Sequence, residues 1–233
     1  MEFRERLIRT LHALEPILRV PGVMVGGSEV PNLLEPDARS SLVVSQDVDI
    51  IVPIEAHGLV RDRSRSIPGF RRSAEEPTIL EPVDTALLEV NFIGMPRKDD
   101  DSGRTFLYED TELPLIVFSR LTLLRGGTTV SVDGLDVPVP RVAGLLVEKL
   151  LTDRSGLKGD RDLLVALGLF MVATADDRDE FAQICDGLSE SDRRSVISGL
   201  TTLSLLPPQP GMPDPSPRRE MIAEIVRGVE RRQ

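Results

Sequence analysis

Residues 48–52, VDIIV, are a strongly apolar, β-branched run that Pro53 closes, and two acidic side chains, Asp47 and Asp49, lie at its start. Such a run predicts a buried β-strand. Side chains alternate between the two faces of a strand, so Asp47 and Asp49 point to the same face and repel each other. A divalent cation would remove that repulsion. The alternative is that both acids lie at a solvated strand start, but the buried character of the following residues favours a cation site.

A third acid lies within a second apolar run, residues 86–93, where Glu89 is followed two positions later by Asn91. An unpaired charge inside a buried strand is unfavourable, so Glu89 is expected to share the cation with the two aspartates. Asn91 falls on the same face of the strand and could supply a neutral ligand. Alternatively, Glu89 pairs with an arginine from the arginine-rich stretch 61–72.

A short apolar run at residues 23–25 leads into Gly26, Gly27 and Ser28. This pattern predicts a strand that enters a tight turn before a short helix. Glycines let the backbone approach a phosphate closely, and the N–H groups at a helix start favour an anion. We therefore interpret Gly26, Gly27 and Ser28 as a phosphate-binding turn, although the same residues also suit a turn with no ligand.

Taken together, the Gly-Gly-Ser turn, the Asp-x-Asp strand and the acid on a later strand resemble the polymerase-β-type nucleotidyltransferase superfamily. The spacing from Gly27 to Asp47 is longer than in minimal members and is more similar to the branch that contains the abortive-infection nucleotidyltransferase toxins. The resemblance spans residues 20–175. It implies an α+β fold, a mixed sheet flanked by helices and followed by a helical C-terminal region. Either Glu89 or Asn91 could match the third carboxylate of the family.

The family resemblance also implies a lysine close to the nucleotide, on a helix that follows the sheet. Lys149 matches this position and is one of only three lysines in the chain. A compact ammonium suits a triphosphate as a point contact. The helix after it is expected to carry Asp162, which would orient Lys149 or Arg161. Lys149 could instead extend from an apolar helix to solvent, and Asp162 could serve only the helix dipole.

The mechanism that follows from the resemblance is transfer of a nucleoside monophosphate from an NTP to a hydroxyl, with release of pyrophosphate. Asp47, Asp49 and Glu89 would be both the catalytic residues and the ligands of Mg²⁺ or Mn²⁺, and Gly26, Gly27, Ser28 and Lys149 would bind the nucleotide. The acceptor would be a protein, a tRNA end or a small molecule, and a cognate antitoxin is a possible partner. The alternatives are a catalytically silent member that senses nucleotides or binds a partner, and an unrelated α/β interaction protein.

The pattern of apolar periodicity and prolines divides the chain into four parts: a catalytic domain at 1–140, a helical region at 141–206, a proline-rich linker at 207–217 and a terminal helix at 218–233. Within the first part, a helix is expected at 3–19, an unpatterned stretch at 54–82, and a hairpin at 128–139 with an Asp-Gly turn. Ser189 and Asp192 predict the start of a helix.

Composition narrows the function classes further. A net charge of -10 disfavours binding to long polyanions and mildly favours a cationic small molecule or a protein as acceptor. The single cysteine, Cys185, excludes an internal disulfide, and two histidines leave little room for a histidine-based metal site. The charged N-terminus and the short uncharged stretch 163–175 predict a cytoplasmic protein with no membrane segment. Residues 99–101, three aspartates, are expected to be a solvated loop.

Overall fold

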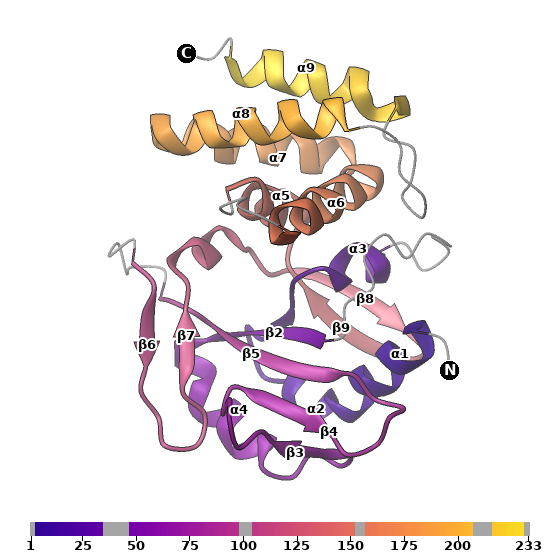
Figure 1. Ribbon diagram of the computed structural model, residues 1–233, viewed down its shortest axis with the longest axis vertical. Coiled ribbons are helices and arrows are strands. Elements are labelled where there is room, and N and C mark those ends of the chain that lie inside the picture. The colour runs from indigo at the N-terminus through magenta and orange to yellow at the C-terminus, as the bar shows by residue number, and fades with distance from the viewer. Residues whose placement is uncertain (1–2, 35–46, 98–103, 152–156, 207–215, 231–233) are drawn as a thin grey trace. The chain divides into compact units, whose positions relative to one another are not determined.

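The computed structural model describes residues 3–34, 47–97, 104–151, 157–206 and 216–230, and the Asp99–Asp101 run lies outside these ranges. The chain divides into two compact units (Figure 1). The first comprises residues 1–30 and 44–140, and the second comprises residues 31–43 and 141–233. Each unit is described by itself below.

The first unit is built on a mixed sheet with the strand order β1-β2-β5-β4-β3, extended at one end of β5 by β7 and then β6. β2 runs parallel to β5, and β5 runs parallel to β7, whereas the other neighbours are antiparallel. The strands in chain order are Met24–Val25, Asp47–Pro53, Phe70–Arg72, Ile79–Pro82, Glu89–Met95, Phe106–Tyr108 and Leu115–Val117.

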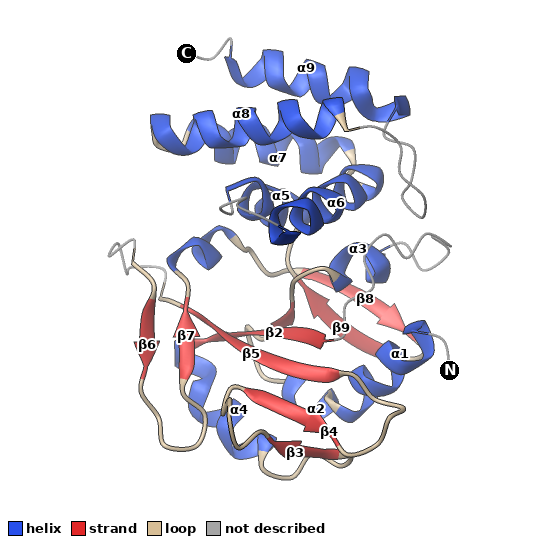
Figure 2. Cartoon of the chain, in the orientation of Figure 1, coloured by secondary structure: helices blue, strands red, loops and turns tan. Residues whose placement is uncertain are grey.

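Helices cover one face of this sheet, as Figure 2 shows. They are α1 (Phe3–Ala13), α2 (Glu15–Leu18) and α4 (His57–Ser64), the last preceded by a 3₁₀ turn at Ile54–Ala56. The single helix expected at 3–19 is divided because Pro16 lies in the first turn of α2, where its missing N–H breaks the hydrogen-bond ladder. The core between helices and sheet is fully buried and aliphatic, with Leu11, Ile50 and Leu88 at its centre.

The predicted hairpin is confirmed as β8 (Thr128–Val132) and β9 (Leu135–Val139), which form a separate two-stranded sheet. Asp133 and Gly134 both have positive φ, at 49° and 80°, as a type I′ turn requires. A 3₁₀ segment, Ser119–Leu123, precedes the hairpin.

The second unit is helical. Its helices are α5 (Val142–Leu151), α6 (Leu157–Val172), α7 (Ala175–Asp186), α8 (Glu190–Leu205) and α9 (Arg219–Glu230), with a 3₁₀ turn at Ser216–Arg218, and α3 (Glu29–Leu34) spans the boundary of the two units. As predicted, Ser189 caps α8 by accepting a hydrogen bond from the Asp192 N–H. No helix within the described residues is both long enough and apolar enough to cross a membrane.

The α+β class is confirmed, but several local predictions are corrected. Residues 54–82 are not unpatterned: they hold α4, β3 and β4. The run expected at 86–93 forms a strand over Glu89–Met95 instead, since Gly94 continues the strand and lies in register with Val117. A side chain at Gly94 would lie 2.6 Å from a Val117 methyl carbon, so glycine permits the close approach of β7 here.

Candidate active site on the open face of the sheet

The predicted acidic residues meet on β2 and β5. Asp47 lies beside Glu89 in the parallel register of the two strands, and Asp49 lies beside Asn91. All four are half-buried, whereas the residues that alternate with them, such as Val48 and Val90, are buried. The four polar side chains therefore share the face of the sheet that the helices of the first unit leave open.

The Gly-Gly-Ser turn lies directly against this group. The Gly26 N–H donates to the Asp49 backbone carbonyl at 2.9 Å. Gly27 has a φ of +71°, and a Cβ placed on it would lie only 2.4 Å from Asp49 Oδ2. Both the backbone conformation and the close approach of the carboxylate therefore require glycine at position 27. The sequence reasoning linked these two motifs only through a family resemblance, and the structure places them in direct contact.

Asn91 forms a side-chain hydrogen bond with Asp49. Its Nδ2 donates to Asp49 Oδ1 at 3.2 Å, which fixes the orientation of that carboxylate. The Asp49 carboxylate also occupies the position where a Cβ of residue 27 would lie, so it is positioned between Gly27 and Asn91. Asn91 thus acts on Asp49, while Glu89 is the neighbour of Asp47.

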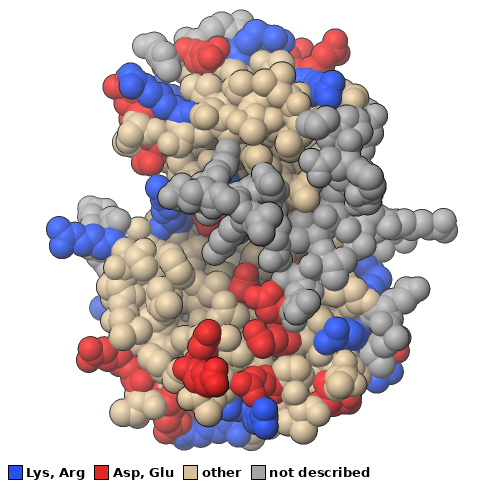
Figure 3. Space-filling model, viewed as in Figure 1, with Lys and Arg blue, Asp and Glu red and all other residues tan. Residues whose placement is uncertain are grey.

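The electrostatics of the site favour a bound cation. The pKa of Glu89 is raised, first by burial and then by the negative charges of Asp47, Glu81 and Glu76. Figure 3 shows acidic side chains gathered in the lower centre of this view, over the first unit. A raised carboxyl pKa means that the ionised form is disfavoured, so neutralising charge from a ligand would stabilise the group.

The arginines of residues 61–72 do not pair with Glu89 in the described part of the chain. Arg71 instead holds Glu81 at 2.8 Å, and Arg61 and Arg65 hold acids on the loop between β6 and β7. Arg63 and Arg72 donate to backbone carbonyls. These contacts tie the arginine-rich stretch into the fold of the first unit.

The three predicted metal ligands do not form a protein-only cage. Among the described residues, no three His, Cys, Asp or Glu side chains come close enough together to hold a metal ion. This arrangement still fits Mg²⁺, which is commonly bound by one or two carboxylates together with substrate phosphates and waters. Asp47 and Asp49 supply two such carboxylates on one sheet face.

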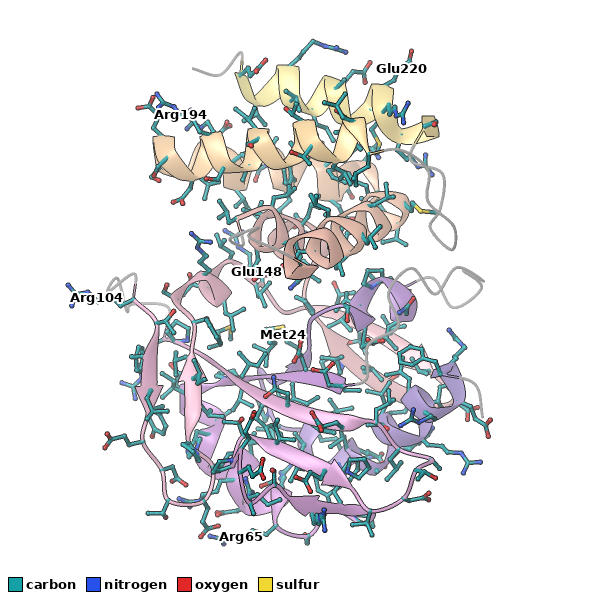
Figure 4. All side chains as sticks on the ribbon, viewed as in Figure 1. Met24, Arg65, Arg104, Glu148, Arg194 and Glu220 are labelled. Carbon is teal, nitrogen blue, oxygen red and sulfur yellow. The ribbon has the colours of Figure 1, made fainter. Side chains whose placement is uncertain are left out.

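Lys149 lies in the second unit, on α5, and its ammonium is held between two acids. Nζ is 3.3 Å from Glu148 Oε2 and 3.4 Å from Asp162 Oδ1, and all three side chains are largely buried (Glu148 is labelled in Figure 4). The expected partnership of Asp162 with Lys149 is therefore present, and the Lys149 ammonium does not extend freely into solvent. The role of Lys149 in phosphate binding stays a prediction. The side chains of Lys158 and Arg161 lie outside the described part.

Two positioning residues were missed by the sequence reasoning. Thr10 on α1 is fully buried, and its Oγ1 accepts the Leu88 N–H at 2.8 Å, while Arg6 donates to the Leu87 carbonyl at 2.6 Å. Together they fix the backbone immediately before Glu89. The sequence could have indicated Thr10, because it lies three residues from Leu7 on the apolar face of its helix. A polar side chain on that face is buried and needs a hydrogen-bond partner.

A histidine and the single cysteine belong to the packed interior of the fold. His57 is buried, and its Nε2–H donates to the Leu113 carbonyl at 2.8 Å. Cys185 is fully buried on α7.

Comparison with known proteins identifies the fold. No protein-family model matches the chain, and no curated protein matches it significantly. A solved structure, an antigenic nucleotidyltransferase-like protein from Paracoccidioides brasiliensis, superimposes over 96% of this chain and 93% of its own with a TM-score of 0.52 at 13% sequence identity. The chain therefore has a nucleotidyltransferase-like fold.

Proposed function

We propose that this protein is a metal-dependent nucleotidyltransferase, which transfers a nucleoside monophosphate from an NTP to a hydroxyl acceptor. One observation carries the proposal: the Gly26–Gly27 turn contacts the Asp49 carboxylate on an open sheet face that also presents Asp47 and Glu89. A backbone turn next to paired acids is what binding of a metal–triphosphate complex needs, because the turn contacts phosphate and the acids hold the cation.

In this proposal Asp47 and Asp49 would hold Mg²⁺ or Mn²⁺, which would supply positive charge to offset that of the triphosphate. Asn91 keeps Asp49 oriented, and the turn at Gly27 and Ser28 positions the phosphates. The acceptor oxygen attacks the α-phosphorus, the bond from that phosphorus to the bridging oxygen breaks, and pyrophosphate leaves with the electron pair. Glu89 would accept the hydroxyl proton, a role suited to a carboxylate whose pKa is raised above its ordinary value by burial and by the neighbouring negative charges.

A catalytically silent, nucleotide-binding protein is the second candidate, and Asn91 is the observation that favours it. An amide beside Asp49 contributes no negative charge at a position where a third carboxylate would strengthen metal binding. Such a protein would bind an NTP with its cation but transfer nothing.

Calorimetric titration with Mg²⁺ and each of ATP, GTP, CTP and UTP tests nucleotide binding. We expect at least one to bind in a Mg²⁺-dependent way, and Asp49→Asn to weaken that binding by about tenfold or more. Asp136→Asn is the matched control, because Asp136 is an exposed acid on β9, a strand of the separate two-stranded sheet. If Asp49→Asn and Asp136→Asn bind as wild type does, the assigned site is wrong.

Transfer is then tested with α-³²P-labelled NTPs and three acceptor pools: total tRNA, an aminoglycoside, and a mixture of purified proteins. The nucleotidyltransferase proposal is supported if an acceptor becomes labelled by the wild-type protein and stays unlabelled with Asp49→Asn. Nucleotide binding without label transfer to any pool, including the protein itself, favours the silent alternative.

A further inference from the structure

The strand β6 forms an open edge of the sheet in the first unit (Figure 1). It pairs antiparallel with β7, and among the described residues no strand pairs with its other side. An unpaired edge presents backbone N–H and C=O groups that can bind a further extended chain.

The outer face of β6 and β7 carries an apolar patch made of Leu107, Ile116 and Phe118. Leu107 and Ile116 are cross-strand partners, and the three side chains are 58%, 47% and 40% exposed. Their strand neighbours Leu115 and Val117 point the other way and are fully buried. The exposed residues are therefore a regular feature of the pleat, and their exposure does not come from a disordered loop.

This patch shares the face of the sheet that bears the acidic site. Val117 lies in register with Gly94 and therefore shares its face of the sheet. Ile116 and Phe118 point to the other face, and Glu89 and Asn91 on β5 point to that same face. In this parallel register Ile116 is level with Ile93, which is two residues from Asn91 and four from Glu89 along β5. At about 3.3 Å per residue and 4.8 Å per strand, Ile116 is roughly 8 Å from Asn91 and 14 Å from Glu89. The patch therefore begins beside the acidic site, on strands that carry none of its acids.

The loop between β6 and β7 is fixed by polar contacts. Asp110 accepts hydrogen bonds from the backbone N–H groups of Glu112 and Leu113 and binds Arg61 at 3.1 Å. These contacts lower the pKa of Asp110 to about 2. Arg65 holds Glu112 at 2.6 Å. A preformed edge loses little conformational entropy when a partner binds.

The edge carries few of the features that normally prevent strand addition. β6 is only three residues long, and shortness is one such feature, but its sequence Phe-Leu-Tyr has no lysine or proline and its pairing with β7 has no bulge. Exposed Arg104 precedes it and exposed Glu109 follows it, and neither forms an ion pair or hydrogen bond within the described residues. Figure 4 shows the Arg104 side chain pointing away from the sheet. The two ends of the edge thus offer opposite charges to a partner.

The area of the patch favours a peptide over a second copy of the chain. Its three side chains expose on the order of 300 Å², within the range of functional patches on monomers. A stable dimer interface needs about 800 Å² from each partner. An extended segment needs less apolar area, because its backbone bonds to the strand edge supply much of the binding.

We propose that the edge of β6, with the patch Leu107, Ile116 and Phe118, binds an extended polypeptide segment that adds a strand antiparallel to β6. The segment carries alternating apolar side chains over the patch, a basic residue at its N-terminal end opposite Glu109 and an acidic residue at its C-terminal end opposite Arg104. This binding does not depend on nucleotidyl transfer, so each proposal can fail alone.

The test uses a fluorescein-labelled peptide, KTVTVD, with capped ends, and fluorescence anisotropy with the full chain. We expect saturable binding, and at least about tenfold weaker binding to Leu107→Asp. Leu59→Asp is the matched control, because Leu59 is 53% exposed on α4, outside the patch. Thermal unfolding of both variants establishes that they remain folded.

Two further peptides separate strand addition from general apolar contact. The charge-exchanged peptide DTVTVK should bind more weakly, and KTVTVD methylated on alternate backbone nitrogens should not bind. The proposal is overturned if KTVTVD does not bind, if both leucine variants bind it equally, or if the methylated peptide binds as well as the unmodified one. Sedimentation that shows a dimer abolished by Leu107→Asp would also overturn it, since the edge would then belong to a second copy.

Discussion

Gly27 offers the sharpest test of the site, because the structure separates two reasons why alanine should fail there. Its φ of +71° lies in the left-handed region, where a Cβ costs about 1–2 kcal/mol. The added Cβ would also lie 2.4 Å from Asp49 Oδ2, so Asp49 must move and lose its hydrogen bond from Asn91, which costs about another 1 kcal/mol. Gly27→Ala should therefore lower the free energy of unfolding by about 2–3 kcal/mol.

Two other glycines in the same unit serve as matched controls. Gly134 has a φ of +80° with nothing within 4 Å of an added Cβ, so Gly134→Ala isolates the backbone contribution, about 1–2 kcal/mol. Gly58 lies within α4, also with open space, and Gly58→Ala should stabilise the unit by about 0.5–1 kcal/mol.

Urea unfolding followed by tyrosine fluorescence measures these differences. The chain has one tyrosine and no tryptophan, and Tyr108 lies in the first unit, where its ring packs 4.8 Å from that of His57. Loss of about 2 kcal/mol should move the unfolding midpoint by about 1 M urea. Magnesium-dependent NTP binding should fall in Gly27→Ala and persist in Gly134→Ala. The reasoning is refuted if Gly27→Ala is no less stable than Gly134→Ala and binds nucleotide normally.

Three further predictions follow from the charged groups. Because the pKa of Glu89 is raised above its ordinary 4.5, wild type should lose stability relative to Glu89→Gln as pH rises through and above 4.5, and a stability difference between the two that is the same at about pH 4 and about pH 7 would contradict this. The pKa of Asp110 is lowered from 3.8 to about 2, so its contribution to stability should be complete above pH 3.8 and lost as pH falls towards 2; unfolding of Asp110→Asn should show a weaker loss over that interval. Lys149→Met leaves the buried Asp162 carboxylate without its cation, and should destabilise the second unit by up to about 3 kcal/mol in calorimetric unfolding. Lys149→Met with Asp162→Leu should recover most of that loss, and an additive double variant would show that the pair is not coupled.

The sequence determined the features that depend on short-range periodicity and turn chemistry. The strand at Asp47 was predictable because β-branched residues and period-two alternation are local properties. The hairpin at Asp133 was predictable because Asp-Gly adopts the positive φ angles of its turn. Ser189 marked a helix start in the same way.

Short elements escaped prediction for the opposite reason. β6 and β7 are three residues each, too short for alternation to be distinguished from chance. α4 has little segregation of polar and apolar residues, so its sequence resembles that of a loop. Arg61, in α4, and Arg65, just after it, also pair with Asp110 and Glu112, which lie 49 and 47 positions away in the chain. These elements form through pairings between distant residues, which a local pattern does not contain.

For the site itself, the sequence named the acids and the turn, whereas only the tertiary structure decided how they meet. The register that sets Glu89 beside Asp47 and Asn91 beside Asp49 depends on how two strands forty residues apart align, and a shift of one residue would move every side chain to the other face. The contact between Gly27 and Asp49 likewise exists only once β1 lies against β2. Residue identity therefore fixed which groups could act, and non-local backbone pairing fixed which of them act together.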